Sequence, residues 1–155
     1  MNDIIHRMHA FQKERGIKDQ CMTNSQYIYD CLRGSGVDSA RVTATLVVKI
    51  IEDYTIWTNV HLVVLVNDVI VDASYDVASV KDKKYCFTIA EWLEYVKEIP
   101  MSPMNLKDIM SNNKYIIEQF VKFLDIAKRI NAGGLLVADK EYYNQQADFV
   151  EKALA

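Results

Sequence analysis

Three side chains whose types suit covalent chemistry lie at informative places in the sequence. Cys21 lies where a loop meets a predicted helix, His61 begins a run rich in valine, and Asp72 lies inside a second such run. A carboxylate that binds one imidazole nitrogen fixes the tautomer of the ring and leaves the other nitrogen to act as a base. A thiol that faces this nitrogen would be activated as a nucleophile. A cysteine, a histidine and an aspartate in this order could therefore form a thiol acyl-transfer site.

The positions of His61 and Asp72 predict that the two side chains meet. Asn67 and Asp68 separate two β-branched runs, which predicts a hairpin with a two-residue turn, in which the numbers of opposed residues sum to 135. Asp72 then lies opposite Val63 and projects from the same face as His61, with the Cβ atoms of this diagonal pair about 7 Å apart. A shift of the pairing by one residue would put the imidazole and the carboxylate on opposite faces.

Cys21 is predicted to lie at the start of a helix over about Met22–Arg33. Ile28 and Leu32 are four residues apart on one face of this segment, and Gly36 follows its end at a position that suits a positive φ. The free N–H groups and the dipole at a helix start stabilise a thiolate and can also receive an oxyanion. The backbone N–H of Cys21 is therefore the predicted oxyanion donor.

The elements that must position these residues have the order helices, strands, helices. Apolar residues at helical spacing precede Cys21, an alternating strand follows Gly36, and a Thr-Ile-Ala-Glu capping box opens a helix after the hairpin. This order predicts an α+β fold with an antiparallel sheet packed on helices at one side. The remaining expected segments are helices over 2–15, 88–99, 113–131 and 139–154, a strand over 42–50, a connection over 53–59 and an ambiguous connector over 101–112.

Length and composition favour one folded domain over residues 1–155, with a core over about 16–99 and a helical C-terminal subdomain over about 101–155. Half of the residues are hydrophobic and a quarter are charged, which excludes general disorder. The net charge of −3 offers no basic surface for a phosphate backbone, so we expect no nucleic-acid partner. His6 and His9 share a helical face but have no third ligand at suitable spacing, so no metal site is expected.

The sequence also predicts a compartment. The longest apolar runs, such as Val60–Val66, are too short to cross a bilayer, and the N-terminus lacks the order of a signal peptide. The three cysteines are an odd number without CxxC spacing, which favours a reducing compartment. We therefore expect a cytoplasmic protein without a membrane partner, as a monomer or a weak dimer.

Residues 20–76 resemble the transglutaminase-like branch of the papain-like thiol enzymes. The shared features are a cysteine that opens a helix, the run Gly36-Val-Asp-Ser-Ala-Arg-Val42 before a strand, His61-Leu-Val-Val, and an aspartate one strand later. The resemblance implies a papain-like/transglutaminase-like core in which the nucleophile helix packs on an antiparallel sheet. It also implies that Cys21 is the nucleophile, that His61 is the general base and acid, and that Asp72 orients His61, with no cofactor.

The resemblance implies acyl transfer from an amide or ester carbonyl, of peptidase, deamidase or transglutaminase type, through a covalent thioester at Cys21. A protein or peptide substrate is expected, with a small amide or ester as the alternative, and hydrolysis and transfer both stay open. The second oxyanion donor also stays open. A papain-type glutamine would be Gln20 or Gln12, and Asn59 and Trp57 precede the histidine where they could line a cleft.

Two other functions stay open at this point. The segment from His61 to Asp72 also resembles arylamine N-acetyltransferases, which implies acetyl transfer from a thioester donor. The second is a non-catalytic interaction module that retains the fold and uses apolar stripes of the helices over Asn113–Leu154 as a partner surface.

Overall fold

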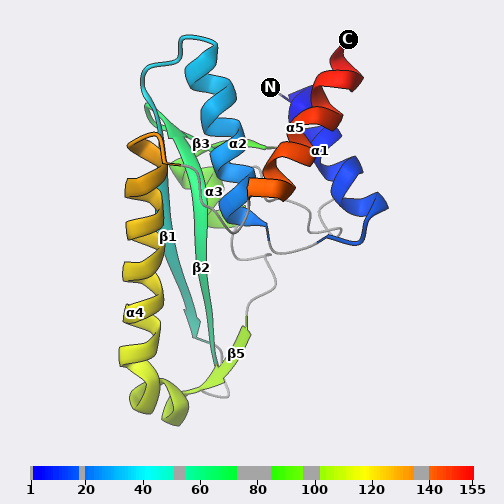
Figure 1. The fold of residues 1–155 in the computed structure, drawn as a ribbon. Coiled ribbons are helices and arrows are strands. Elements are labelled where there is room, and N and C mark those ends of the chain that lie inside the picture. The colour runs from blue at the N-terminus through cyan, green and yellow to red at the C-terminus, as the bar shows by residue number, and fades with distance from the viewer. Residues whose placement is uncertain (1, 18–19, 51–54, 73–84, 96–101, 135–139) are drawn as a thin grey trace.

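The computed structural model describes residues 2–17, 20–50, 55–72, 85–95, 102–134 and 140–155 (Figure 1). The helices are α1 (Asn2–Glu14), α2 (Cys21–Gly34), α3 (Ile89–Tyr95), α4 (Leu106–Asn131) and α5 (Lys140–Leu154). The strands are β1 (Ala40–Ile50), β2 (Thr55–Val66), β3 (Val69–Val71), β4 (Cys86–Thr88) and β5 (Ser102–Asn105). The strands form one antiparallel sheet in the order β1-β2-β3-β4, and β5 also pairs with β2. The predicted α+β class is therefore confirmed.

The hairpin between β2 and β3 has the predicted register. Val64 pairs with Val71 and Val66 pairs with Val69, so the paired numbers sum to 135. Asn67 has a φ of 53°, the positive value that a tight hairpin turn needs and that asparagine tolerates better than most residues. The turn thus sets the faces from which the side chains of both strands project.

Three segments differ from the sequence-based expectation. β2 already begins at Thr55, so the expected connection over 53–59 is wrong from Thr55 onward, and residues 53–54 lie outside the described part. This segment becomes a strand because it pairs with β1 on one side and with β5 on the other, and β5 lies far away along the chain. The connector over 101–112 contains β5 and the start of α4, and β4 was not expected. The end of the helix expected over 88–99 lies outside the described residues.

Helices cover both faces of the sheet. α2 lies along one side of β1 and β2 and α4 lies along the other (Figure 1), and both helices contact both strands. The expectation of helices at one side is therefore wrong, because successive residues of β2 point to opposite faces and Leu62, Val63 and Val64 are all fully buried. Ile126 of α4 and Val150 of α5 belong to the same hydrophobic cluster as these residues. This core holds α2 against β2.

Candidate functional site

Cys21 is the first residue of α2. Gln20 before it forms no side-chain cap, although its carbonyl accepts the backbone N–H of Asn24 at 2.9 Å. The first N–H groups of a helix have no acceptor within the helix and carry partial positive charge. The Cys21 thiol is partly exposed and forms no disulfide. The start of α2 therefore combines a reduced thiol with N–H groups that can bind an anion.

His61 and Asp72 form a hydrogen bond, as the hairpin register predicts. The distance from His61 Nε2 to Asp72 Oδ1 is 2.9 Å, and the side chains are 13% and 1% exposed, respectively. Asp72 follows the last residue of β3, and its N–H donates to the carbonyl of Tyr85 at 2.9 Å. This backbone bond keeps Asp72 in line with the sheet, so its carboxylate is buried and directed at the imidazole.

The protonation of His61 depends on both of its neighbours. Burial lowers the pKa of the imidazole, but the charge and hydrogen bond of Asp72 and those of Cys21 raise it, so that the pKa rises from 6.5 to about 10. Cys21 and Asp72 therefore both act directly on the ring. Because Asp72 binds Nε2, Nδ1 is the ring nitrogen that remains for the thiol. At neutral pH this environment favours an imidazolium between a carboxylate and a sulfur.

Two further hydrogen bonds hold the backbone of β2 in place at His61 and Leu62. Ser25 on α2 donates from Oγ to the carbonyl of Leu62 at 3.0 Å, and Thr45 on β1 donates from Oγ1 to the carbonyl of His61 at 3.1 Å. The first bond joins α2 to β2, and the second joins β1 to β2. Sequence analysis missed both residues, because a serine within a helix or a threonine within a strand carries no local signal of such a contact.

Gln12 lies in a buried polar network. Its Nε2 lies 2.6 Å from Asn24 Oδ1, 2.8 Å from Tyr142 Oη and 3.1 Å from Gln146 Oε1. Gln12 and Asn24 are 2% exposed and Gln146 is fully buried, so the network joins α1, α2 and α5 in the interior. These partners occupy the Gln12 amide, and its role as an oxyanion donor stays a prediction.

Gln20, Asn59 and Trp57 keep their roles as predictions. Gln20 is the N-cap residue of α2, and its Oε1 accepts a hydrogen bond from Thr23 Oγ1 at 3.5 Å. Asn59 and Trp57 lie on β2 before His61, but their side chains are outside the described part. The backbone N–H of Cys21, at the first position of α2, stays the predicted oxyanion donor.

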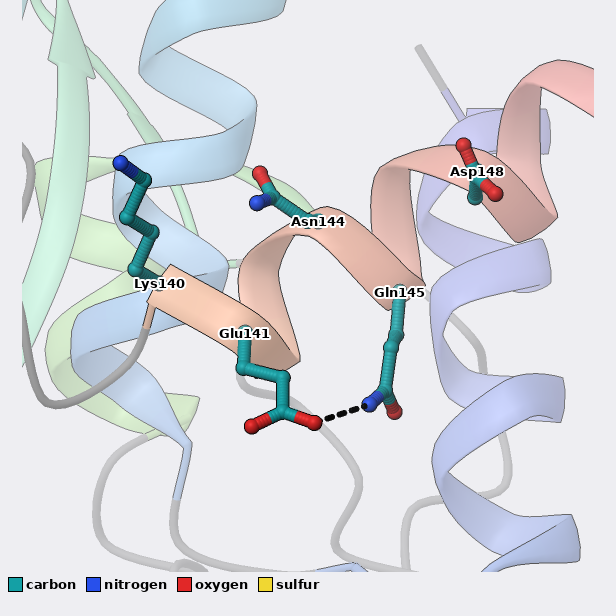
Figure 2. A pocket seen from close by; sticks show the side chains of 5 residues that line it. All are labelled: Lys140, Glu141, Asn144, Gln145 and Asp148. Atoms are coloured by element: carbon teal, nitrogen blue, oxygen red, sulfur yellow. Dashed lines mark hydrogen bonds between the residues drawn. The ribbon is translucent and has the colours of Figure 1, made fainter.

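A pocket lies on α5 (Figure 2). Its lining consists of polar and charged side chains of that helix, namely Lys140, Glu141, Asn144, Gln145 and Asp148. All of them are exposed, and Gln145 Nε2 donates to Glu141 Oε1 at 3.4 Å. Cys21, His61 and Asp72 do not line this pocket, so it has no part in the candidate site.

The described residues contain no group of three His, Cys, Asp or Glu side chains that could hold a metal ion. His6 and His9 instead contact the ring of Tyr85 edge-on, at centroid distances of 5.1 and 5.4 Å. In the same part of the chain, no helix is both long and apolar enough to span a membrane.

The site as a whole brings a thiol, an imidazole and a carboxylate into one chain of contacts. Such an arrangement can perform covalent chemistry at a carbonyl carbon. Comparisons of the chain with family models, with curated proteins and with solved structures found no match. The function is therefore inferred from the geometry of the site.

Proposed function

We propose that this protein is a cysteine-dependent acyl-transfer enzyme with a papain-like, transglutaminase-like core. The observation that carries the proposal is that one imidazole interacts both with Asp72, at 2.9 Å, and with the thiol of Cys21 at a helix start. A nucleophile beside a base, with a third group that orients the base, is the signature of nucleophilic catalysis. In this proposal Cys21 is the nucleophile, His61 is the general base and acid, and Asp72 orients His61.

The first half-reaction forms a thioester. The Cys21 sulfur attacks the carbonyl carbon of an amide or ester, a C–S bond forms, and the carbonyl electron pair moves onto the oxygen. The N–H of Cys21 at the start of α2 receives this oxyanion. As the oxyanion collapses, the bond to the leaving group breaks, and the imidazolium of His61 gives its proton to the leaving amine or alcohol.

The second half-reaction restores the enzyme. His61, now neutral, removes a proton from water or from an acceptor amine as that molecule attacks the thioester carbonyl. The C–S bond breaks and releases a carboxylic acid or a new amide. The proton stays on His61 beside the thiolate of Cys21, so the resting state is recovered. Hydrolysis and transfer differ only in the acceptor.

The electrostatics of His61 support this assignment. With a pKa of about 10, the ring is an imidazolium at neutral pH. A cation in contact with a thiol stabilises the thiolate, which is the form that attacks. Asp72, whose side chain is 1% exposed, balances the charge of the ring and holds its orientation.

The proposed substrate is a protein or peptide amide, with a small amide or ester as the alternative, because the thioester chemistry accepts each of these carbonyl groups. The chemistry also requires Cys21 to stay reduced. Cys21, Cys31 and Cys86, all within the described residues, form no disulfide. We therefore propose the cytoplasm, where glutathione and thioredoxin keep thiols reduced, as the working compartment.

The ester p-nitrophenyl acetate tests the proposal. In the wild type we expect an initial burst of p-nitrophenolate and an acetyl group that mass spectrometry locates on Cys21. Cys21→Ala should lose both signals, and His61→Gln should slow the burst about a hundredfold or more because the base is gone. Cys31→Ala is the matched control and should behave as the wild type, since Cys31 lies on the same helix but burial raises the pKa of its thiol.

Acetylation of Cys21 at equal rates in the wild type and in His61→Gln would contradict the proposal, because the thiol would then react without the imidazole.

Acetyl-coenzyme A as the donor tests acetyl transfer: an acetyl group on Cys21 would favour that reaction. An inert Cys21 in a dimeric protein would favour the interaction module instead. Ile117 and Val121 offer that module an apolar surface, since they are 52% and 57% exposed on α4.

A further inference from the structure

Ser25 joins the helix of the nucleophile to the strand of the base. Its side chain is fully buried, and its Oγ donates to the carbonyl of Leu62 at 3.0 Å. Cys21 and Ser25 are four residues apart on α2, so they lie on the same face of that helix. Leu62 directly follows His61 on β2. The bond therefore connects the two elements one turn from the sulfur and one residue from the imidazole.

The neighbouring side-chain hydrogen bonds hold other elements together. Thr45 joins β1 to β2, and Gln12 of α1 binds Asn24 of α2. Ser25 instead forms a side-chain hydrogen bond between α2 and β2. The other contribution of α2 to the common core comes from apolar side chains such as Ile28, and apolar contacts have no preferred direction.

We propose that Ser25 is a positioning residue for the proposed reaction, on which this inference rests: its hydrogen bond to Leu62 sets the distance between the Cys21 sulfur and the His61 ring. Loss of the hydroxyl would allow α2 to shift relative to β2. A hydrogen bond weakens steeply when its geometry departs from the optimum. A small shift would therefore weaken the contact through which the imidazolium activates the sulfur.

The rate at which iodoacetamide alkylates Cys21, measured from about pH 4 to about pH 10, tests this role, because the thiolate is the reactive form. Mass spectrometry locates the label. The midpoint of the pH profile of this rate in the wild type is the reference for the variants. Ser25→Ala should raise the midpoint by about one pH unit, which lowers the rate below both midpoints about tenfold. Ser25→Thr keeps the hydroxyl and should retain the wild-type midpoint.

Ser35→Ala is the matched control. Ser35 Oγ donates to the carbonyl of Cys31 at 2.9 Å at the far end of α2, so this variant also loses a serine hydrogen bond. A merely structural role of Ser25 would lower the melting temperature and leave the midpoint unchanged. If Ser25→Ala does not fold, Ser25→Cys replaces it with the same expected rise, because a thiol has a similar shape but donates weakly.

The outcomes separate this role from the proposed function. A midpoint that rises in His61→Gln but not in Ser25→Ala overturns the role of Ser25 and leaves the proposed function standing. Equal midpoints in the wild type and in His61→Gln refute the proposed function and the role of Ser25 together. A midpoint that rises in both variants, but not in Ser35→Ala, supports both.

Discussion

Replacing Asp72 by asparagine keeps the size of the side chain but removes the charge that faces His61. In the folded protein, Asp72 Oδ1 lies 2.9 Å from His61 Nε2, and the pKa of the imidazole is raised to about 10. Burial acts in the opposite direction and lowers this pKa. In Asp72→Asn we therefore expect the pKa of His61 to fall toward its ordinary value of 6.5.

The same substitution has a predictable effect on stability. A rise of the His61 pKa from 6.5 to about 10 corresponds to about 5 kcal/mol in favour of the protonated folded state. The unfolded state releases this proton above pH 6.5 while the folded state keeps it, so the contribution is complete below pH 6.5 and is lost as the pH rises toward 10. Between about pH 6.5 and about pH 8.5, the free energy of unfolding of the wild type should fall by about 2 kcal/mol from this group.

Urea unfolding at a series of pH values measures this slope. The slope should disappear in Asp72→Asn and remain in Asp125→Asn, the matched control, whose carboxylate is 67% exposed and lies 3.4 Å from Arg129 on α4. An upper limit of about pH 8.5 keeps the measurement below the range in which Cys31, whose thiol pKa is raised by burial, also lowers stability.

A wild-type free energy of unfolding that stays constant over this pH range would refute the reasoning, because the folded state would then bind no additional proton. Equal slopes in the wild type and in Asp72→Asn would assign the proton to a different group. Titration of the His61 ring by NMR distinguishes the two results, since it reports the pKa of this imidazole directly.

Two other substitutions test elements around the site. Thr88→Ala removes the capping box of α3, in which Glu91 N–H donates to Thr88 Oγ1 at 3.2 Å and Thr88 N–H donates to Glu91 Oε2 at 3.1 Å. It should lower the free energy of unfolding by about 1 kcal/mol, and an unchanged urea midpoint would argue against the cap. Asn131→Ala removes two hydrogen bonds, of 2.8 and 3.0 Å, between the end of α4 and the backbone of Val42. It should cost about 1–3 kcal/mol and speed hydrogen exchange at the Val42 amide, whereas unaltered exchange would show that β1 does not need this contact.

The hairpin shows how much a short window of sequence can predict. Asn67 and Asp68 between two β-branched runs predicted the register, and the register predicted that His61 and Asp72 share a face. The hydrogen bond between these two side chains follows from that geometry. The capping box at Thr88 was predictable for the same reason, since its partner is three residues away.

Gln12 shows where such prediction ends. Its amide binds Asn24 on α2 and two side chains of α5 that are 130 and 134 residues away, and the sequence around Gln12 does not predict these partners. Burial of an amide requires hydrogen-bond partners, and which partners are available depends on how the helices pack. The hydrogen bond from Ser25 to Leu62 joins residues that are 37 positions apart, so the sequence did not predict it either.

Local interactions were thus sufficient for the start of α2 beside Cys21, for the hairpin turn and for the common face of His61 and Asp72, because each depends on residues a few positions apart. Tertiary packing alone decided that β5 pairs with residues 55–58 of β2, that helices cover both faces of the sheet and that Ser25 binds the strand of the base. These features depend on pairing and burial between elements that are far apart along the chain, and a side chain acquires its partner only when those elements pack together.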